Sequence, residues 1–210
     1  LVLTGENTFG GPTTITAGTI RIGNGGTTGS LGAGNVVNNA SLSFNRSDTI
    51  TVTNTISGTG SLSHDSPGTT ILTGTNTYTG VTIIRGNNGT SGEVQVVSIN
   101  DGGVAGNLGQ ASNAASNLVF GLTGGSTGKM VYTGTGESTD RLFTIDGNTI
   151  IENNGTGSLN FTNTGDLGKT SGISQSLTLG GTNGGSFAAN IIKGSGSSNV
   201  TLTKTGTGAW

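Results

Sequence analysis

The chain of 210 residues contains no cysteine and only two prolines, and charged residues make up 9% of it. The absence of cysteine excludes disulfides and thiolate metal sites. The eight basic residues are scattered singly, whereas a nucleic-acid surface needs several positive charges close together, so no nucleic-acid partner is expected. No apolar run approaches the roughly 18 residues of a membrane-spanning helix, so this segment is not expected to insert into a membrane.

Glycine and β-branched residues are the most abundant residues in the sequence. The chain has 42 glycines, about three times the usual share, and the Thr, Val and Ile between them suit short strands. Apolar residues alternate in pairs, which indicates strands with one buried face; the pairs are Ile20/Ile22, Leu42/Phe44, Ile50/Val52, Val94/Val96, Leu118/Phe120, Met130/Tyr132, Phe143/Ile145, Leu159/Phe161, Leu177/Leu179 and Val200/Leu202. No stretch has the apolar spacing of a helix, so no significant helix is expected.

Nearly the same string occurs twice, as LTGENTFGG at residues 3–11 and as LTGTNTYTG at residues 72–80. Such a repeat is typical of stacked structural units, and each copy is expected to bury the same face against its neighbour. Asn and Thr at equivalent positions can form ladders between coils about 4.8 Å apart. These features predict an all-β solenoid in preference to a sandwich or barrel, with on the order of nine coils of about 20–25 residues.

The repeat also predicts how the chain is organised. The strings LSHDSPGTT (residues 62–70) and LTKTGTGAW (residues 202–210) align, which divides a single solenoid segment, 1–210, into units 1–70 and 71–210. The chain is then a piece of a longer array or one period of it. Its uncapped ends, with Leu1, Val2 and Trp210, are expected to associate end to end or to continue that array. Segment 100–117 breaks the strand rhythm and is predicted to protrude as a loop.

These strings resemble the passenger-associated repeat of bacterial autotransporters. The resemblance rests on LTGTNTYTG followed by VTI and preceded by ISGTGSL, on the spacer-like segment 134–165, and on LTKTGTGAW, which is similar to the family's GxGxW junction. It implies a right-handed parallel β-helix that is secreted through the outer membrane and displayed or released outside the cell. The string LSHDSPGTT departs from the family pattern at His64, Asp65 and Pro67.

Few residues are candidates for chemistry. His64 beside Asp65 is the only His–carboxylate neighbour pair, but one His without clustered acids is a poor metal site, and the pair is predicted to lie in a solvated loop. Asp140, Arg141 and Glu137 form the densest charged group, and a structural role is expected there, with Asp140 capping a turn. The sequence cannot pair the remaining candidate acids, Asp101, Asp146 and Glu152. We therefore predict no catalytic, cofactor-binding or metal-binding residues and no cofactor.

The function that this pattern favours is structural. We expect a stalk or fibre segment of a secreted or cell-surface protein in which each coil templates the next. Two alternatives remain open: a carbohydrate-active β-helix enzyme with a groove near Glu137 and Asp140, and an adhesin that binds a specific receptor or polysaccharide.

Overall fold

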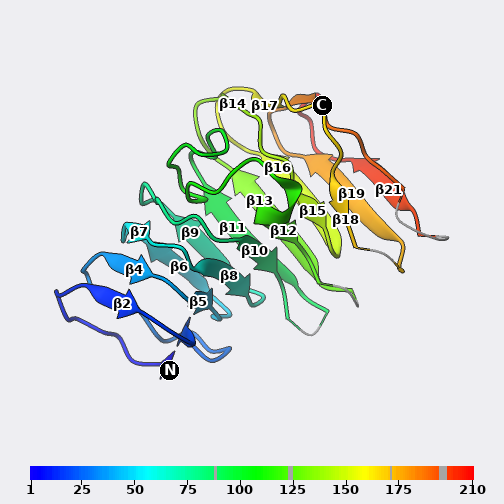
Figure 1. Ribbon diagram of the computed structural model, residues 1–210. Coiled ribbons are helices and arrows are strands. Elements are labelled where there is room, and N and C mark those ends of the chain that lie inside the picture. The colour runs from blue at the N-terminus through cyan, green and yellow to red at the C-terminus, as the bar shows by residue number, and fades with distance from the viewer. Residues whose placement is uncertain (88, 123–124, 171, 194–197) are drawn as a thin grey trace.

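The computed structural model describes residues 1–87, 89–122, 125–170, 172–193 and 198–210. The chain coils steadily from one end of the molecule to the other, so that the N-terminal strands and the C-terminal strands lie at opposite ends (Figure 1). Within the described residues its only helix is a single 3₁₀ turn, η1 (Ala115–Asn117), and the named strand pairs are all parallel. The predicted all-β parallel solenoid is confirmed. No helix in the described part is long and apolar enough to span a membrane.

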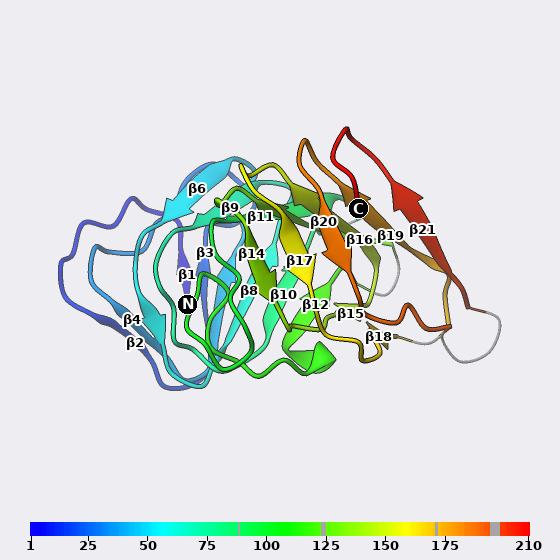
Figure 2. The same cartoon turned by 90° about the horizontal axis from the view of Figure 1, so that it is seen from above.

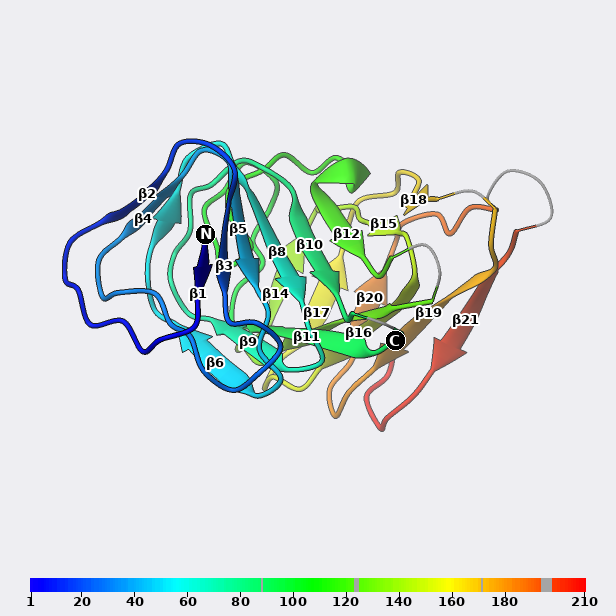
Figure 3. The same ribbon diagram turned by 90° about the horizontal axis from the view of Figure 1, so that it is seen from below.

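Three walls surround the interior. The first wall is an eight-stranded sheet of β1 (Val2–Leu3), β3 (Thr19–Ile22), β5 (Ser41–Phe44), β8 (Ser61–Asp65), β10 (Thr82–Arg85), β12 (Leu118–Phe120), β15 (Thr144–Ile145) and β18 (Gly168–Lys169). The second wall is a seven-stranded sheet of β6 (Thr49–Val52), β9 (Thr69–Leu72), β11 (Ser91–Val96), β13 (Thr127–Tyr132), β16 (Asn148–Asn153), β19 (Gln175–Gly180) and β21 (Val200–Lys204). The third wall has two three-stranded sheets, β2 (Thr13–Ile15), β4 (Val36–Asn38) and β7 (Ile56–Ser57), and β14 (Glu137–Thr139), β17 (Leu159–Phe161) and β20 (Gly185–Phe187). Figures 2 and 3 show these walls from above and below.

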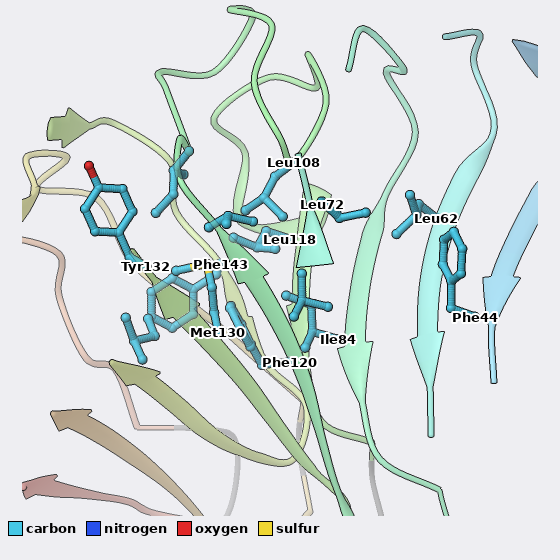
Figure 4. Packing of buried hydrophobic residues seen from close by; sticks show 14 of the residues in the cluster. Phe44, Leu62, Leu72, Ile84, Leu108, Leu118, Phe120, Met130, Tyr132 and Phe143 are labelled. Atoms are coloured by element: carbon cyan, nitrogen blue, oxygen red, sulfur yellow. The ribbon is translucent and has the colours of Figure 1, made fainter. Parts of the chain in front are cut away.

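The strand register stacks like positions directly over one another. In the first wall, one inward ladder runs through Phe44, His64, Ile84, Phe120 and Ile145, and all five side chains are buried. Each coil therefore removes apolar surface of its neighbour from water, which is the main driving force for a stacked fold. The period-two pairs of the sequence supply this interior, which Figure 4 shows from close by.

Aromatic side chains fill the interior toward the C-terminal end. Phe143 packs edge-on against Phe120 at a centroid distance of 5.3 Å and against Phe161 at 6.0 Å. Phe187 continues the stack, 5.4 Å from Phe161. The edge-to-face pairs of Phe143 with Phe120 and Phe161 add to the free energy of apolar burial because ring edges and faces carry opposite partial charge.

Asparagine side chains tie the corners of neighbouring coils together. The amide oxygen of Asn107 accepts the backbone N–H groups of Val97 and Ser98, both at 2.9 Å, and its amide N–H donates to the Gly74 carbonyl at 3.0 Å. At the Gly58 corner φ is +101°, and a Cβ there would collide with the Asn38 carbonyl of the preceding coil. The corners therefore require Asn for buried polar groups and Gly for close backbone approach.

The two copies of the repeated string lie on different walls, contrary to the expectation that both bury the same face. In the second copy the string joins β9 of the second wall to β10 of the first wall, and Tyr78 is fully buried. In the first copy it joins β1 of the first wall to β2 of the third wall, and the equivalent Phe9 is 44% exposed.

Segment 100–117 is anchored in the third wall through its middle, at residues 106–111. Leu108 lies among the buried residues of the interior (Figure 4), and Ala111 is buried as well. The backbone N–H of Gln110 donates to the Tyr78 carbonyl, and Asn76 and Gly106 form a two-way bridge. Val104 instead is 50% exposed. The exposed residues of this segment lie in the turn around Val104 and toward its end, at Ser112, Ala114 and Ser116.

Candidate functional site

The densest polar cluster of the described residues joins segment 98–113 to the end of β14. We call it the Arg141 network, and it consists of Asp101, Glu137, Asp140 and Arg141 with their backbone partners. The sequence placed three of these residues together because they are neighbours in the string GESTDRLF. It could not place Asp101, which arrives from a coil almost forty residues earlier.

Arg141 is the centre of this network, and its side chain is buried. Its guanidinium donates to backbone carbonyl oxygens of the anchored segment: Asn100 (3.1 Å), Ala111 (3.1 Å), Gly109 (2.8 Å), Asp101 (3.4 Å) and Val104 (3.4 Å). Guanidinium has five N–H donors in a fixed plane and matches such a ring of acceptors. Burial lowers the pKa of Arg141, although nearby acids oppose that shift. The side chain holds an irregular loop in shape.

The carboxylates of the network accept backbone N–H groups. Glu137 accepts from Ile99 at 2.5 Å and from Asn100 at 3.3 Å. Asp140 accepts from the Gly102 N–H and from the Asn113 amide, both at 2.7 Å. The Asp140 N–H in turn donates to the Asp101 carboxylate at 2.8 Å. This is the capping role that the sequence predicted for Asp140, with Gly102 as its backbone partner.

The pKa of Glu137 is raised by burial, while the hydrogen bonds from Ile99 and Asn100 act in the opposite direction. A raised carboxyl pKa is a feature of general acids. Both Glu137 oxygens are nevertheless occupied by backbone donors, and the same holds for Asp140 with its backbone and amide donors. The arrangement fixes loop geometry, and it offers no carboxylate pair that flanks an open groove in the manner of a glycosidase.

The prediction for His64 was wrong. His64 is buried in β8, on the inward ladder between Phe44 and Ile84, and it does not lie in a solvated loop. Its Nε2 lies 2.9 Å from the Ser66 carbonyl and its Nδ1 lies 2.9 Å from the Thr70 hydroxyl. Because a carbonyl only accepts, Nε2 carries the proton and Nδ1 accepts from Thr70. The strand continues through Asp65, so alternation along it sends His64 inward and Asp65 outward.

Asp65 forms a separate polar group on the outer face of the first wall. Its carboxylate pairs with Arg85 and accepts from the hydroxyls of Ser43 at 2.9 Å and Ser63 at 2.8 Å. Burial favours a higher pKa for Asp65, but the hydrogen bonds from Arg85, Ser63 and Ser43 together lower it. The group links three successive coils, β5, β8 and β10.

A row of charged side chains crosses the outer face of the second wall. Lys129 Nζ lies 3.2 Å from Glu93 and 3.1 Å from Glu152, which stand on the coils before and after it. Burial lowers the pKa of Lys129, but the two carboxylates raise it by more. Asp146 lies in the turn between β15 and β16, where its backbone N–H donates to the Phe120 carbonyl. Within the described residues, no group of three His, Asp or Glu side chains could hold a metal ion.

The geometry of these groups shows what class of protein this is: a parallel β-solenoid. Among the described residues, its polar side chains join successive coils and do not form a catalytic arrangement. Two comparisons narrow that class. Residues 1–22 and 65–96 match the passenger-associated-transport-repeat family. The whole chain is similar to part of the Adhesin BmaC autotransporter of Brucella suis biovar 1 (strain 1330), with 38% identity over 248 residues.

The resemblance seen in the sequence is thus confirmed: the chain carries passenger-associated repeats and is similar over its whole length to part of an autotransporter adhesin. The alignment covers 100% of this chain but 7% of the curated relative, so the chain spans a small part of that protein's length. No solved structure matches the chain significantly.

Proposed function

We propose that the chain is a structural stalk segment of a secreted, cell-surface passenger. The observation that carries this proposal is the continuity of the walls, with eight strands in the first and seven in the second. In such a stack the load is shared by main-chain hydrogen bonds between coils, and each coil adds about 4.8 Å of length. The passenger-type repeats and the similarity to an adhesin autotransporter support the assignment to the cell surface.

The side chains suit this role because most polar groups act between coils. Asn107 reaches the coil of Gly74, Lys129 bridges the coils of Glu93 and Glu152, and Arg141 fastens the longest irregular segment to the wall. We infer a non-enzymatic role, since the acids nearest to a catalytic arrangement, Glu137 and Asp140, are engaged by backbone donors.

The register allows a sharp test. Val36 pairs with Ile56, Ser41 with Ser61 and Thr49 with Thr69, so each of the three walls advances by 20 residues at this point (56 − 36, 61 − 41, 69 − 49). Deleting residues 36–55 removes one whole coil and keeps every later strand on its own wall. Deleting only residues 36–45 is the matched control, because it moves the following strands to the wrong wall.

For a stalk, the whole-coil deletion folds, unfolds cooperatively and shortens the particle by about 4.8 Å in small-angle scattering. In the parent passenger it leaves surface display and cell binding unchanged, whereas the half-coil deletion impairs folding. A whole-coil deletion that folds and reaches the surface but loses cell binding would contradict the stalk assignment and place a binding site in this part of the chain.

One observation favours a second candidate, the receptor-binding adhesin. Val97, directly after β11, and Val104, in the outward turn of segment 100–117, are each about half exposed. An apolar side chain held outward by an anchored loop is a suitable contact for a receptor. Replacing Val104 with Asp would then abolish cell binding by the parent passenger without changing its thermal stability, and unchanged binding would exclude this contact.

A further inference from the structure

A polar hollow lies on the outer face of the first wall. It has a volume of about 280 Å³, and its lining includes Arg21, Asn45, Asp65, Arg85 and Asn87. These residues belong to β3, β8 and β10 or directly follow β5 and β10, and the four strands lie side by side in Figure 3. β1 precedes β3 in this wall and β12 follows β10. The hollow therefore lies on the side of the solenoid, with further coils before and after it.

Two of the four arginines of the chain line this hollow. Arg21 is exposed, and within the described part of the chain its guanidinium has no hydrogen bond or ion pair. Arg85 pairs with Asp65 through Nε, and its two terminal nitrogens donate to no described residue. In Arg46 and Arg141, by contrast, every guanidinium nitrogen donates to an oxygen. The guanidinium nitrogens that still lack an acceptor thus gather in one hollow.

Asp65 is the one carboxylate among the lining residues. One of its oxygens pairs with Arg85, and the other accepts the hydroxyls of Ser43 at 2.9 Å and Ser63 at 2.8 Å. Its charge is therefore balanced by Arg85, and its oxygens already have donors. The positive charge of Arg21 remains in excess, so the hollow as a whole favours an anion.

The neutral groups of the hollow suit hydroxyls. The Asn45 amide N–H donates to the Asp65 carbonyl at 3.0 Å, which fixes the orientation of the amide, and its oxygen can accept a further hydrogen bond. Asn87 is only partly buried and contributes a second amide. An amide offers both donors and acceptors, and a sugar hydroxyl needs both.

We propose that this hollow binds an acidic polysaccharide, with a carboxylate or sulfate group on the Arg21 guanidinium. Guanidinium matches either anion with two parallel N–H donors. Arg21 and Arg85 stand on strands three spacings apart, about 14 Å along the axis, so an extended glycan contacts both residues and a small anion contacts one. Two arginines are too few for tight binding of nucleic-acid phosphates. The site goes beyond the proposed stalk function, which needs no ligand, and a stalk can carry it on its side.

Isothermal titration calorimetry of the wild-type chain tests this proposal with three purified glycans. Polygalacturonate supplies carboxylates, dextran sulfate supplies sulfates, and dextran is the uncharged control. Binding is expected to polygalacturonate, to dextran sulfate or to both, with none to dextran, and the stronger of the two identifies the preferred anion. The affinity is expected to fall as the ionic strength rises.

Arg21→Gln is expected to weaken this binding about tenfold or more. Its thermal stability should match that of the wild type, because the Arg21 side chain is exposed and has no partner to lose. Arg21→Lys keeps the charge without the planar donors and should bind with intermediate affinity. Lys204→Gln is the matched control: it removes the same charge from an exposed residue of β21, in the second wall, and is expected to bind like the wild type.

Three results overturn the proposal. The first is a wild-type chain that binds neither acidic glycan. The second is equal weakening by Arg21→Gln and Lys204→Gln, which would show a general effect of net charge. The third is binding of polyglutamate or single-stranded DNA as tight as that of the glycans and equally dependent on Arg21, which would assign the hollow to a peptide or a nucleic acid. Because the isolated chain and purified probes are used, these results are independent of the coil-deletion test of the stalk.

Discussion

The Tyr78 hydroxyl lies 2.7 Å from the Thr82 hydroxyl in the interior of the solenoid, where both side chains are buried. Thr82 also lies within hydrogen-bond distance of the Leu108 carbonyl, at 3.3 Å. The repeat string, the strand that follows it and the anchored loop therefore meet at one point. Burial raises the pKa of Tyr78 to about 12, so the phenol stays protonated and available as a donor over the ordinary pH range.

Tyr78→Phe removes one buried hydrogen bond but keeps the ring, and it is expected to lower the free energy of unfolding by about 1 kcal/mol. Tyr78→Ala also creates a cavity and is expected to cost about 3–5 kcal/mol. Phe9→Ala, at the equivalent position of the first repeat, is the control and should cost much less because Phe9 is already half exposed. Urea denaturation measures all three, and equal costs for Tyr78→Ala and Phe9→Ala would contradict the difference in packing.

Asn76 belongs to the same repeat and joins neighbouring coils. Its amide oxygen accepts the Ile56 N–H at 2.8 Å, and its amide N–H donates to the Asn107 carbonyl at 2.8 Å. Asn76→Ala leaves two buried backbone groups without partners, so a loss of about 2–4 kcal/mol is expected. Asn7→Ala in the first repeat serves as the control, because Asn7 is only partly buried. A cost at Asn76 no larger than that at Asn7 would show that water replaces the amide.

His64 is expected to make the stability of the chain depend on pH. Burial lowers its pKa from the ordinary value of 6.5, so the folded state favours the neutral ring. Below pH 6.5 the unfolded chain takes up a proton that the folded chain does not, and stability falls by up to about 1.4 kcal/mol per pH unit until the lowered pKa is reached. Above pH 6.5 the effect is absent.

The chain has one histidine, so a single substitution isolates the contribution of His64 to this slope. His64→Gln keeps a neutral polar side chain in the ladder and is expected to abolish the slope between about pH 7.5 and about pH 5.5, whatever its effect on stability at neutral pH. Denaturant unfolding of both proteins across this range is the measurement. A slope that persists in His64→Gln would assign the effect to other groups.

Arg141 is expected to be the most sensitive charged residue. Arg141→Met leaves several buried carbonyls without donors and the acids Glu137 and Asp140 without a neighbouring positive charge, which should cost about 3 kcal/mol or more. Backbone amides of residues 99–111 are expected to exchange with deuterium faster than those of the walls. Lys129→Met is the control: its ion pairs are partly exposed, so about 1 kcal/mol or less is expected. If the two variants changed the exchange of residues 99–111 equally, Arg141 would not be the residue that holds this segment in place.

The particular strands show how far sequence reasoning extends. Alternating pairs such as Leu42/Phe44 and Leu159/Phe161 predicted buried strand faces, and both pairs are buried. That inference depends only on the geometry of a strand, in which side chains alternate between two faces. The repeated string and the scarcity of charge then favoured stacked coils. The high content of Gly and Asn agreed with short strands and with stacked coils, because these residues fit the corners between walls.

Sequence reasoning was least informative where a residue's environment comes from another coil. His64 was assigned to a loop because Pro67 and Gly68 follow it, but pairing with β5 and β10 extends the strand through Asp65. Segment 100–117 lacks strand pattern, yet Arg141 holds much of it against the wall from about forty residues away. The Asn that recurs in LTGENT and LTGTNT indicated a structural role for the Asn76 side chain, although the string does not reveal its hydrogen-bond partners.

By itself the sequence determined that this chain forms short strands with one apolar face and that these strands stack in parallel coils, because period-two alternation and repetition are local properties. Only the tertiary structure decided which polar residues enter the interior and which wall each repeat occupies. Those outcomes depend on contacts between coils twenty to forty residues apart, and such contacts form only when the register of the whole stack is set.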